Sequence, residues 1–140
     1  MNLSKELRIF LLYARQNEEA VWRLYQRLVK AGADVWLDQE KLLPGQDWTH
    51  EIYNAIHTSD IVIACLSRQF IKQGGYRHEE LRMALEKANS LLNGQIFLIP
   101  ARLERCNVPE PLQRWQRVDL FESDGYKKLI FTLKKWGAPP

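Results

Sequence analysis

Cysteine and histidine are scarce in this 140-residue sequence, which contains two and three of them respectively. Cys65 lies inside an apolar run and Cys106 in a predicted loop, so their positions indicate neither a zinc site nor a disulfide framework. His50, His57 and His78 lie on different segments and do not suggest a metal site. We therefore expect no metal and no resident cofactor, and the cysteine usage fits a reducing cytosol.

Long hydrophobic runs and a surplus of charge of one sign are also absent. The longest apolar runs are about six residues, far short of the roughly 20 that a membrane-spanning helix needs. The first six residues contain no apolar signal core. The 20 basic and 17 acidic residues give a net charge of +3, which is too balanced to indicate nucleic acid or a membrane surface. We expect a cytoplasmic protein with neither of these partners.

Hydrophobic periodicity predicts strands that alternate with helices. Apolar runs predict strands over 7–12, 33–37, 60–66, 95–99 and 117–120. Helical spacing of apolar residues predicts helices over 18–31, 47–58, 76–92 and 123–136. Segments 67–75 and 101–115 are predicted to be irregular, and Pro100 is expected to end the fourth strand. The alternation implies right-handed βαβ units, and hence an α/β, flavodoxin-like, doubly wound sheet of five parallel strands with helices on both faces.

Ligands of such folds bind at the carboxyl ends of the strands, and the residues there exclude several nucleotide-binding classes. A phosphoacceptor receiver needs acidic residues after the first strand and an Asp at the end of the third, but this sequence has Tyr13-Ala14-Arg15 and Ser67. The G-x-G-x-x-G motif of dinucleotide-binding folds and the P-loop are both missing. Tyr13 to Asn17 also lacks the Ser, Thr and Gly of a flavin-phosphate loop.

The segment after the second predicted strand, WLDQEKLLPGQDW at 36–48, is a long loop with apolar residues at its tip. Pro44-Gly45 predicts a turn, and Asp47 is a candidate N-cap for the following helix. Leu42 and Leu43 have two interpretations. They either contact a partner or fold back onto the core of their own domain.

This segment resembles the BB loop of a Toll/interleukin-1 receptor (TIR) domain. It matches the pattern of the bacterial branch, W-L-D-x-x-x-L-x-P-G-x-D-W, residue for residue. Further blocks at 10–14, 59–67, 75–85, 99–103 and 115–120 resemble the family in the same order, with Leu12 where Ser is common. The resemblance covers roughly residues 7–136, so a single TIR domain over 1–136 is expected. The remaining Gly-Ala-Pro-Pro at 137–140 is expected to begin a linker to a fused sensor or effector domain.

The resemblance to the NAD-cleaving branch implies an enzyme that breaks the nicotinamide–ribose bond. Its products would be nicotinamide and ADP-ribose or a cyclic ADP-ribose isomer, often in defence against phage. The family also implies self-association with other TIR domains, here through Leu42 to Gln46. The alternative is a non-catalytic TIR–TIR interaction module in signalling.

Two neighbouring glutamates compete for the catalytic role. Cleavage of an N-glycosidic bond passes through an oxocarbenium-like ribose, which a carboxylate can stabilise. Glu80 borders the apolar side of the predicted helix, whereas Glu79 has Arg82 three residues on and is expected to be solvated. Tyr76 lies one helical turn before Glu80, on the same face, and can stack on a ring of NAD. Both glutamates can alternatively be helix-start acids favoured by the dipole, and Tyr76 a core or rim residue.

Four other positions follow from the resemblance. Tyr13, Ala14 and Arg15, directly after the first strand, are expected to contact the ribose or phosphates of NAD, with Arg15 facing the pyrophosphate. Glu40, in the loop after the second strand, matches a nucleotide-contacting position of animal NAD-cleaving members. The alternative for Arg15 and Glu40 is an ordinary surface charge.

Overall fold

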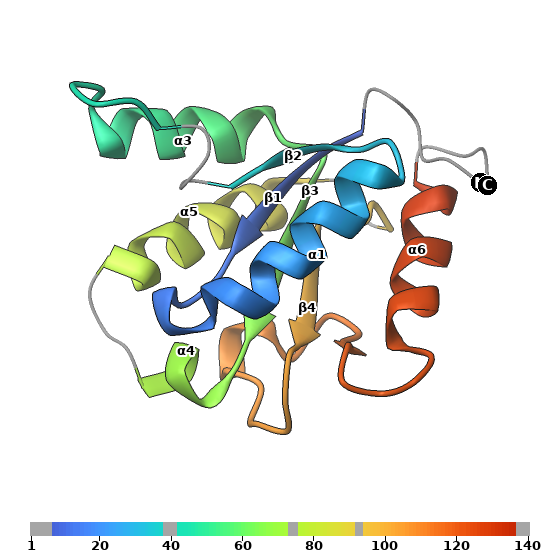
Figure 1. The fold of residues 1–140 in the computed structure, drawn as a ribbon. Helices are drawn as coiled ribbons and strands as arrows, with labels where there is room; N and C mark the ends of the chain where they lie inside the picture. Colours follow the sequence, from blue (N-terminus) through green and yellow to red (C-terminus); the bar gives the residue numbers. More distant parts are fainter. Residues whose placement is uncertain (1–6, 38–41, 73–75, 92–93, 137–140) are drawn as a thin grey trace.

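The computed structural model describes residues 7–37, 42–72, 76–91 and 94–136, with the backbone alone for 76–78. Within this part of the chain, five parallel strands form one sheet in the order β2-β1-β3-β4-β5 (Figure 1). Their bounds are Arg8–Leu12 for β1, Asp34–Trp36 for β2, Ile61–Leu66 for β3, Leu98–Arg102 for β4 and Val118–Asp119 for β5. This order confirms the predicted flavodoxin-like fold.

Helices cover both faces of the sheet. They are α1 (Glu18–Lys30), α3 (Trp48–Thr58), α4 (Arg68–Lys72), α5 (Tyr76–Ser90) and α6 (Gly125–Lys135), with short 3-10 turns at Arg15–Asn17 and Glu110–Leu112. The apolar sides of α1 and α6 pack on one face, and those of α3 and α5 on the other (Figure 1). No described helix is long and apolar enough to cross a membrane.

Strand β3 lies at the centre of both hydrophobic layers. Its side chains alternate, so that Ile61, Ile63 and Cys65 face the layer of α1 and α6, while Val62 and Ala64 face that of α3 and α5. All are fully buried, as the continuous apolar run predicts. Burial raises the pKa of the Cys65 thiol to about 12, which keeps it protonated and chemically inert at neutral pH.

Helix α3 is capped at both ends. The carboxylate of Asp47 accepts a hydrogen bond from the backbone N–H of His50 at 3.2 Å, which confirms the predicted N-cap. At the other end, Lys87 Nζ of α5 donates to the carbonyls of His57 and Ser59, each at 2.7 Å. A cation bound to carboxyl-terminal carbonyls satisfies groups that have no partner within the helix. Lys87 therefore fixes α5 against α3.

The segment 67–75 was predicted to be irregular, but it contains helix α4 over Arg68–Lys72. Ser67 begins this helix, because its hydroxyl accepts a hydrogen bond from the backbone N–H of Phe70 at 3.0 Å. Phe70 is buried against the sheet. A single buried aromatic residue in five positions gives no helical periodicity, so the sequence pattern missed this turn.

The bounds predicted for the fourth strand were also wrong, since β4 continues through Pro100. The main chain of Phe97 bonds to Val62 of β3, whereas that of Arg102 bonds to Leu120 on the β5 side. Because main-chain groups alternate sides along a strand, Pro100 faces the β5 side. Pairing with β5 begins one residue later, so the missing N–H of proline removes no bond from the sheet.

An ion pair holds the two-residue strand β5 to the sheet. The Arg102 guanidinium of β4 donates to both carboxylate oxygens of Asp119, at 2.7 and 2.8 Å, and to the carbonyl of Cys106 at 2.8 Å. The bonds from Arg102 to the carboxylate, with a further bond from Arg117 at 3.1 Å, lower the pKa of Asp119 to about 2. The pair is half-buried, so water screens it only partly.

We expect this pair to make stability depend on pH below about 4. A carboxylate with a lowered folded-state pKa stabilises the fold above its ordinary pKa, and this contribution is lost as pH falls toward 2. Arg102→Gln should therefore cost about 2 kcal/mol at pH 7 and flatten the pH dependence of unfolding between about pH 4 and 2.

Urea unfolding of both proteins over this pH range measures the effect. Lys128→Gln is the matched control, because its pair with Asp124 at 3.4 Å is exposed and should contribute less than about 0.5 kcal/mol. An Arg102→Gln protein with the pH profile of the unmodified protein would show that the pair does not govern acid stability.

Candidate functional site

The carboxyl ends of β1 and β3 meet where the order of strands reverses. From β1 the chain proceeds to β2 on one side, and from β3 it proceeds to β4 on the other. This switch point is where doubly wound folds bind ligands. In Figure 1 the helix α4 and the beginning of α5 lie at the end of the sheet to which the β1 and β3 arrows point. The candidate site is therefore built from the segments after β1 and β3 and from the first turns of α5.

A hydrogen bond joins the two strand ends at this point. The Ser67 hydroxyl, fully buried after β3, donates to the side-chain oxygen of Asn17 at 2.5 Å. Asn17 follows β1 and directly precedes α1. Neither residue was assigned a role in the sequence analysis, because a bond across 50 residues leaves no local pattern. The sequence signal that could have indicated them is their position after two predicted strands, whose carboxyl ends meet at one edge of the sheet.

The structure separates the two candidate glutamates. Glu80 is 1% exposed and lies beside the buried Leu81 and Ala84, which pack against the sheet. Glu79 is partly exposed and pairs with the exposed Arg82 on the same helix. The predicted environments, an apolar border for Glu80 and a solvated one for Glu79, are thus confirmed. The catalytic role of Glu80 stays a prediction.

The residues expected to contact NAD lie in different environments. The side chains of Tyr13 and Ala14 are buried on opposite faces of the sheet, so a ligand at the strand end would meet mainly their backbone. Arg15 is exposed at the start of the 3-10 turn. Glu40 and the side chain of Tyr76 lie outside the described residues. For all five, contact with NAD remains a prediction.

The two leucines at the loop tip lie in different environments, and each fits one of the two interpretations. Leu42 is partly buried and packs against the layer of α3 and α5, whereas Leu43 is 64% exposed. The Gln46 side chain accepts a hydrogen bond from the Leu43 N–H at 2.7 Å, and the Gln46 N–H donates to the Leu43 carbonyl at 3.1 Å. Gly45 has φ +90°, which favours glycine. The turn therefore holds one leucine inward and presents the other to solvent.

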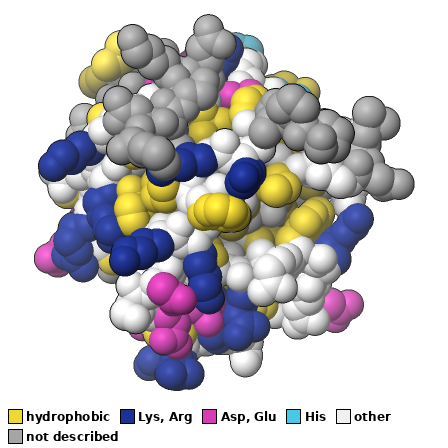
Figure 2. Space-filling model, turned by 90° about the vertical axis from the view of Figure 1, so that its right-hand side faces the viewer, with side chains coloured by type: hydrophobic (Ala, Val, Ile, Leu, Met, Phe, Trp, Pro, Cys, Tyr) yellow, Lys and Arg dark blue, Asp and Glu magenta, His cyan; other side chains and the backbone are white. Residues whose placement is uncertain are grey.

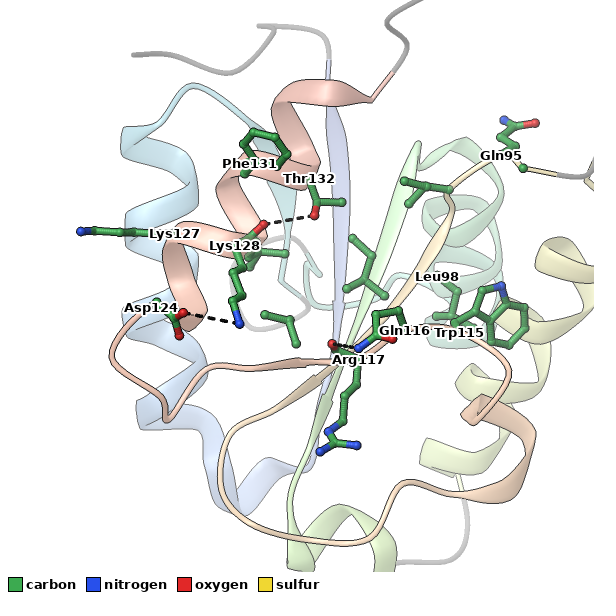
Figure 3. A pocket seen from close by; sticks show the side chains of 15 residues that line it. Gln95, Leu98, Trp115, Gln116, Arg117, Asp124, Lys127, Lys128, Phe131 and Thr132 are labelled. Atoms are coloured by element: carbon green, nitrogen blue, oxygen red, sulfur yellow. Dashed lines mark hydrogen bonds and ion pairs between the residues drawn. The ribbon is translucent and has the colours of Figure 1, made fainter. Parts of the chain in front are cut away.

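A large cavity in the described part of the chain lies elsewhere. It has a volume of about 760 Å³ and lies between α6 and the outer edge of β4 (Figure 3). Its lining includes neither Glu80 nor Arg15. We therefore treat this cavity and the switch-point site as separate features.

Sequence comparison connects the chain to a known family. A family model described as "TIR domain" matches residues 9–130. Among curated proteins, the chain is 30% identical over 131 residues to the uncharacterized protein y4cD of Sinorhizobium fredii. The match covers 91% of this chain and 20% of that protein. The chain thus spans about one fifth of the length of the curated relative it matches.

Three solved structures illustrate the structural likeness. The TIR domain of the Toll-related receptor TRR-2 from Hydra magnipapillata has a TM-score of 0.75 at 22% identity, over 90% of this chain and 97% of that one. The TIR domains of the activated Roq1 resistosome have a TM-score of 0.69 at 17% identity, over 93% and 99%. The CMP N-glycosidase BcmB of Clostridium botulinum has a TM-score of 0.57 at 18% identity, over 89% and 98%. At these identities the likeness shows a common fold.

We expect the Ser67–Asn17 bond to stabilise the switch point. Ser67→Ala removes both the partner of Asn17 and the cap of α4, and buried groups left without partners destabilise by about 1–3 kcal/mol. Ser90→Ala is the control, since among the described residues that exposed hydroxyl bonds within its own helix and its loss should change stability by less than about 0.5 kcal/mol. Equal melting temperatures for the two variants would contradict a stabilising role for Ser67.

Proposed function

The chain belongs to the TIR domain family, and from this premise we propose that it is an NAD glycohydrolase that cleaves the nicotinamide–ribose bond. The observation that carries the proposal is the burial of Glu80, which is 1% exposed near the start of α5. Acidic side chains are seldom fully buried unless they are paired, and this one lies beside the strand ends where doubly wound folds bind ligands. NAD is the substrate in this proposal, and no further cofactor or metal takes part.

The proposed chemistry requires few groups. The bond between the ribose carbon and the nicotinamide nitrogen breaks, and the nitrogen keeps the electron pair. This neutralises the pyridinium and leaves an oxocarbenium-like ribose. The Glu80 carboxylate holds the ribose hydroxyls and stabilises this developing positive charge. Water then adds to the ribose carbon and releases a proton to the solvent to give ADP-ribose. Alternatively, a nitrogen of the adenine adds and the adenine loses a proton, which gives a cyclic isomer.

The remaining predicted contacts position the dinucleotide. Arg15 is an exposed cation beside the carboxyl end of β1, which suits a pyrophosphate. Tyr76 begins α5 one turn before Glu80, and its ring would stack on the nicotinamide or adenine. Tyr13, Ala14 and Glu40 complete the proposed contacts around the ribose and phosphates.

The likeness to BcmB supports this class of reaction. That protein is a CMP N-glycosidase, so it acts on the bond between a base and a ribose in a nucleotide. Because a fold alone does not imply a function, this likeness supports the proposal by analogy.

We further propose that the domain acts when it self-associates. Leu43 is held outward by a closed turn and is 64% exposed, so a neighbouring TIR domain can bury it. The likeness to the TIR domains of the Roq1 resistosome, an assembled state, supports this step. Placement in the cytoplasm, a fused sensor or effector domain and a role in antiphage defence belong to the same proposal.

A non-catalytic TIR–TIR interaction module is the second candidate function. The exposed Leu43 favours it equally, because an interaction surface needs no buried carboxylate. Release of nicotinamide from NAD by concentrated protein separates the two candidates.

We expect Glu80→Gln to lower nicotinamide release by roughly a hundredfold or more, because removal of a group that stabilises the transition state typically has this effect. Nicotinamide is measured by liquid chromatography after incubation with NAD. The amide has nearly the same volume as the carboxylate, so thermal unfolding should remain cooperative.

Glu79→Gln is the matched control, since this neighbouring glutamate pairs with Arg82 near the surface. It should retain activity within about threefold, because exposed ion pairs contribute little. Full activity of Glu80→Gln together with an inactive Glu79→Gln would show that the wrong carboxylate had been chosen.

We expect Leu43→Asp to reduce self-association and activity together. Burial of one leucine between protomers contributes roughly 1–2 kcal/mol, and a charge at the same place opposes contact. Light scattering and nicotinamide release over a hundredfold dilution series measure the two properties on the same samples.

Val29→Asp is the control, because this α1 residue is also an exposed hydrophobic, at 44%, but lies away from the loop. It should behave as the unmodified protein does. A specific activity that stays constant on dilution, from a protein that is monomeric throughout, would rule out activation by assembly.

A further inference from the structure

The cavity beside α6 exists because β5 is shorter than its neighbour. β4 has five residues and β5 has two, and β5 pairs only with Ala101 and Arg102. Beside the first residues of β4 no described strand continues the sheet, and α6 lies across this open edge (Figure 3). The result is a groove of about 760 Å³, defined by the residues of α6, β4 and the segment before β5.

The floor and rim of this groove are apolar. Apolar side chains come from β4 and the residues leading into it, from the start of β5 and from α6: Ile96, Leu98, Ile99, Val118, Leu129 and Phe131. Ile96 is 42% and Phe131 64% exposed, so water contacts hydrophobic surface here. The volume lies within the range of small-molecule sites, which also combine an apolar lining with a few polar groups.

The polar groups of the groove are distributed unequally. In Figure 3 the side chains of Arg117 and Lys128 lie toward one end of the groove, and Gln95 lies at the other. Of the described residues that line the groove, only Asp124 is acidic. Figure 2 shows the side of the molecule on which α6 lies, with hydrophobic side chains bordered by Lys and Arg side chains. The groove thus has an apolar body and a polar end, where Arg117 and Lys128 carry the positive charge and Asp119, Glu122 and Asp124 lie nearby.

Both cations can accept another partner. Arg117 donates through Nε to Asp119 at 3.1 Å, and within the described residues the structure records no bond for its two terminal nitrogens. Lys128 pairs with Asp124 at 3.4 Å in an exposed ion pair, which holds the ammonium only weakly. An incoming anion would therefore meet three or more available N–H donors.

We propose that the groove binds a small amphipathic organic anion, with its acidic head at Arg117 and Lys128 and an acyl or aryl chain along the apolar floor. Charge complementarity selects an anion, and the length of apolar lining selects a hydrophobic body over a free phosphate. The groove shares no residue with the switch-point site, so this binding does not depend on NAD cleavage.

Fluorescence of 8-anilinonaphthalene-1-sulfonate, an aromatic sulfonate, tests the proposal on the folded chain. The probe should bind and be displaced by dodecanoate. Dodecan-1-ol and dodecyltrimethylammonium, with the same chain and a neutral or cationic head, should displace it about tenfold less effectively or worse. Equal displacement by all three compounds would mean that the cations play no part, and would overturn the proposal.

Two variants locate the binding. The double variant Arg117→Gln with Lys128→Gln should weaken dodecanoate about tenfold or more, and Phe131→Asp should weaken it by placing a like charge at the apolar rim. Arg23→Gln with Lys30→Gln is the matched control, because it makes the same charge change on α1, outside the groove. It should bind within about twofold of the unmodified protein. Circular dichroism confirms that each variant is folded.

Three results would overturn the proposal. In the first, the double variant folds and binds dodecanoate as the unmodified protein does. In the second, the probe does not bind, or binds only to variants that have lost their fold. In the third, light scattering shows a dimer that Phe131→Asp dissociates and that dodecanoate leaves intact, which would assign the groove to a second copy of the chain.

Discussion

Burial of the parallel sheet on both faces is the constraint on which the remaining structure depends. The central strands β1 and β3 lie between two layers of helices, and β3 is buried along its whole length. Such strands can carry almost no polar side chains. A buried polar group without a hydrogen-bond partner loses its hydration, which destabilises the fold by about 2–7 kcal/mol. Polar chemistry is therefore confined to the strand ends and the outer edge. The two candidate sites of the molecule lie at these two places.

At the strand ends, the position of α5 decides what the site can do. Lys87 binds the last carbonyls of α3, while Leu81 and Ala84 pack against the sheet. These contacts hold α5 against α3 and the sheet, and Glu80, next to Leu81, is buried. The Ser67–Asn17 bond connects the ends of β1 and β3 directly. A carboxylate held in this way has a defined position and little contact with water, which are the conditions that electrostatic catalysis requires.

At the outer edge, a very short strand has two consequences. Arg102 and Asp119 hold β5 to the sheet although it has only two residues. Gly125 allows the chain to turn into α6 at once, since any Cβ there would overlap the carbonyl oxygen of Asp119. The edge of β4 before this point stays open, and α6 forms the second wall of the groove. The short strand that this ion pair holds to the sheet therefore leaves a groove beside it.

The sequence by itself determined the alternation of strands and helices, the parallel sheet, the family and the contrast between Glu79 and Glu80. Each of these follows from periodicity or from contiguous blocks of residues, which record local structure and the buried face. Four features were decided only by the tertiary structure. They are helix α4 after Ser67, the continuation of β4 through Pro100, the partial burial of Leu42 beside the exposed Leu43, and the groove at the short edge strand. These depend on which residues meet across distant parts of the chain. Long-range contacts of this kind leave no period in the sequence, because the partners are brought together only when the sheet and its helices pack.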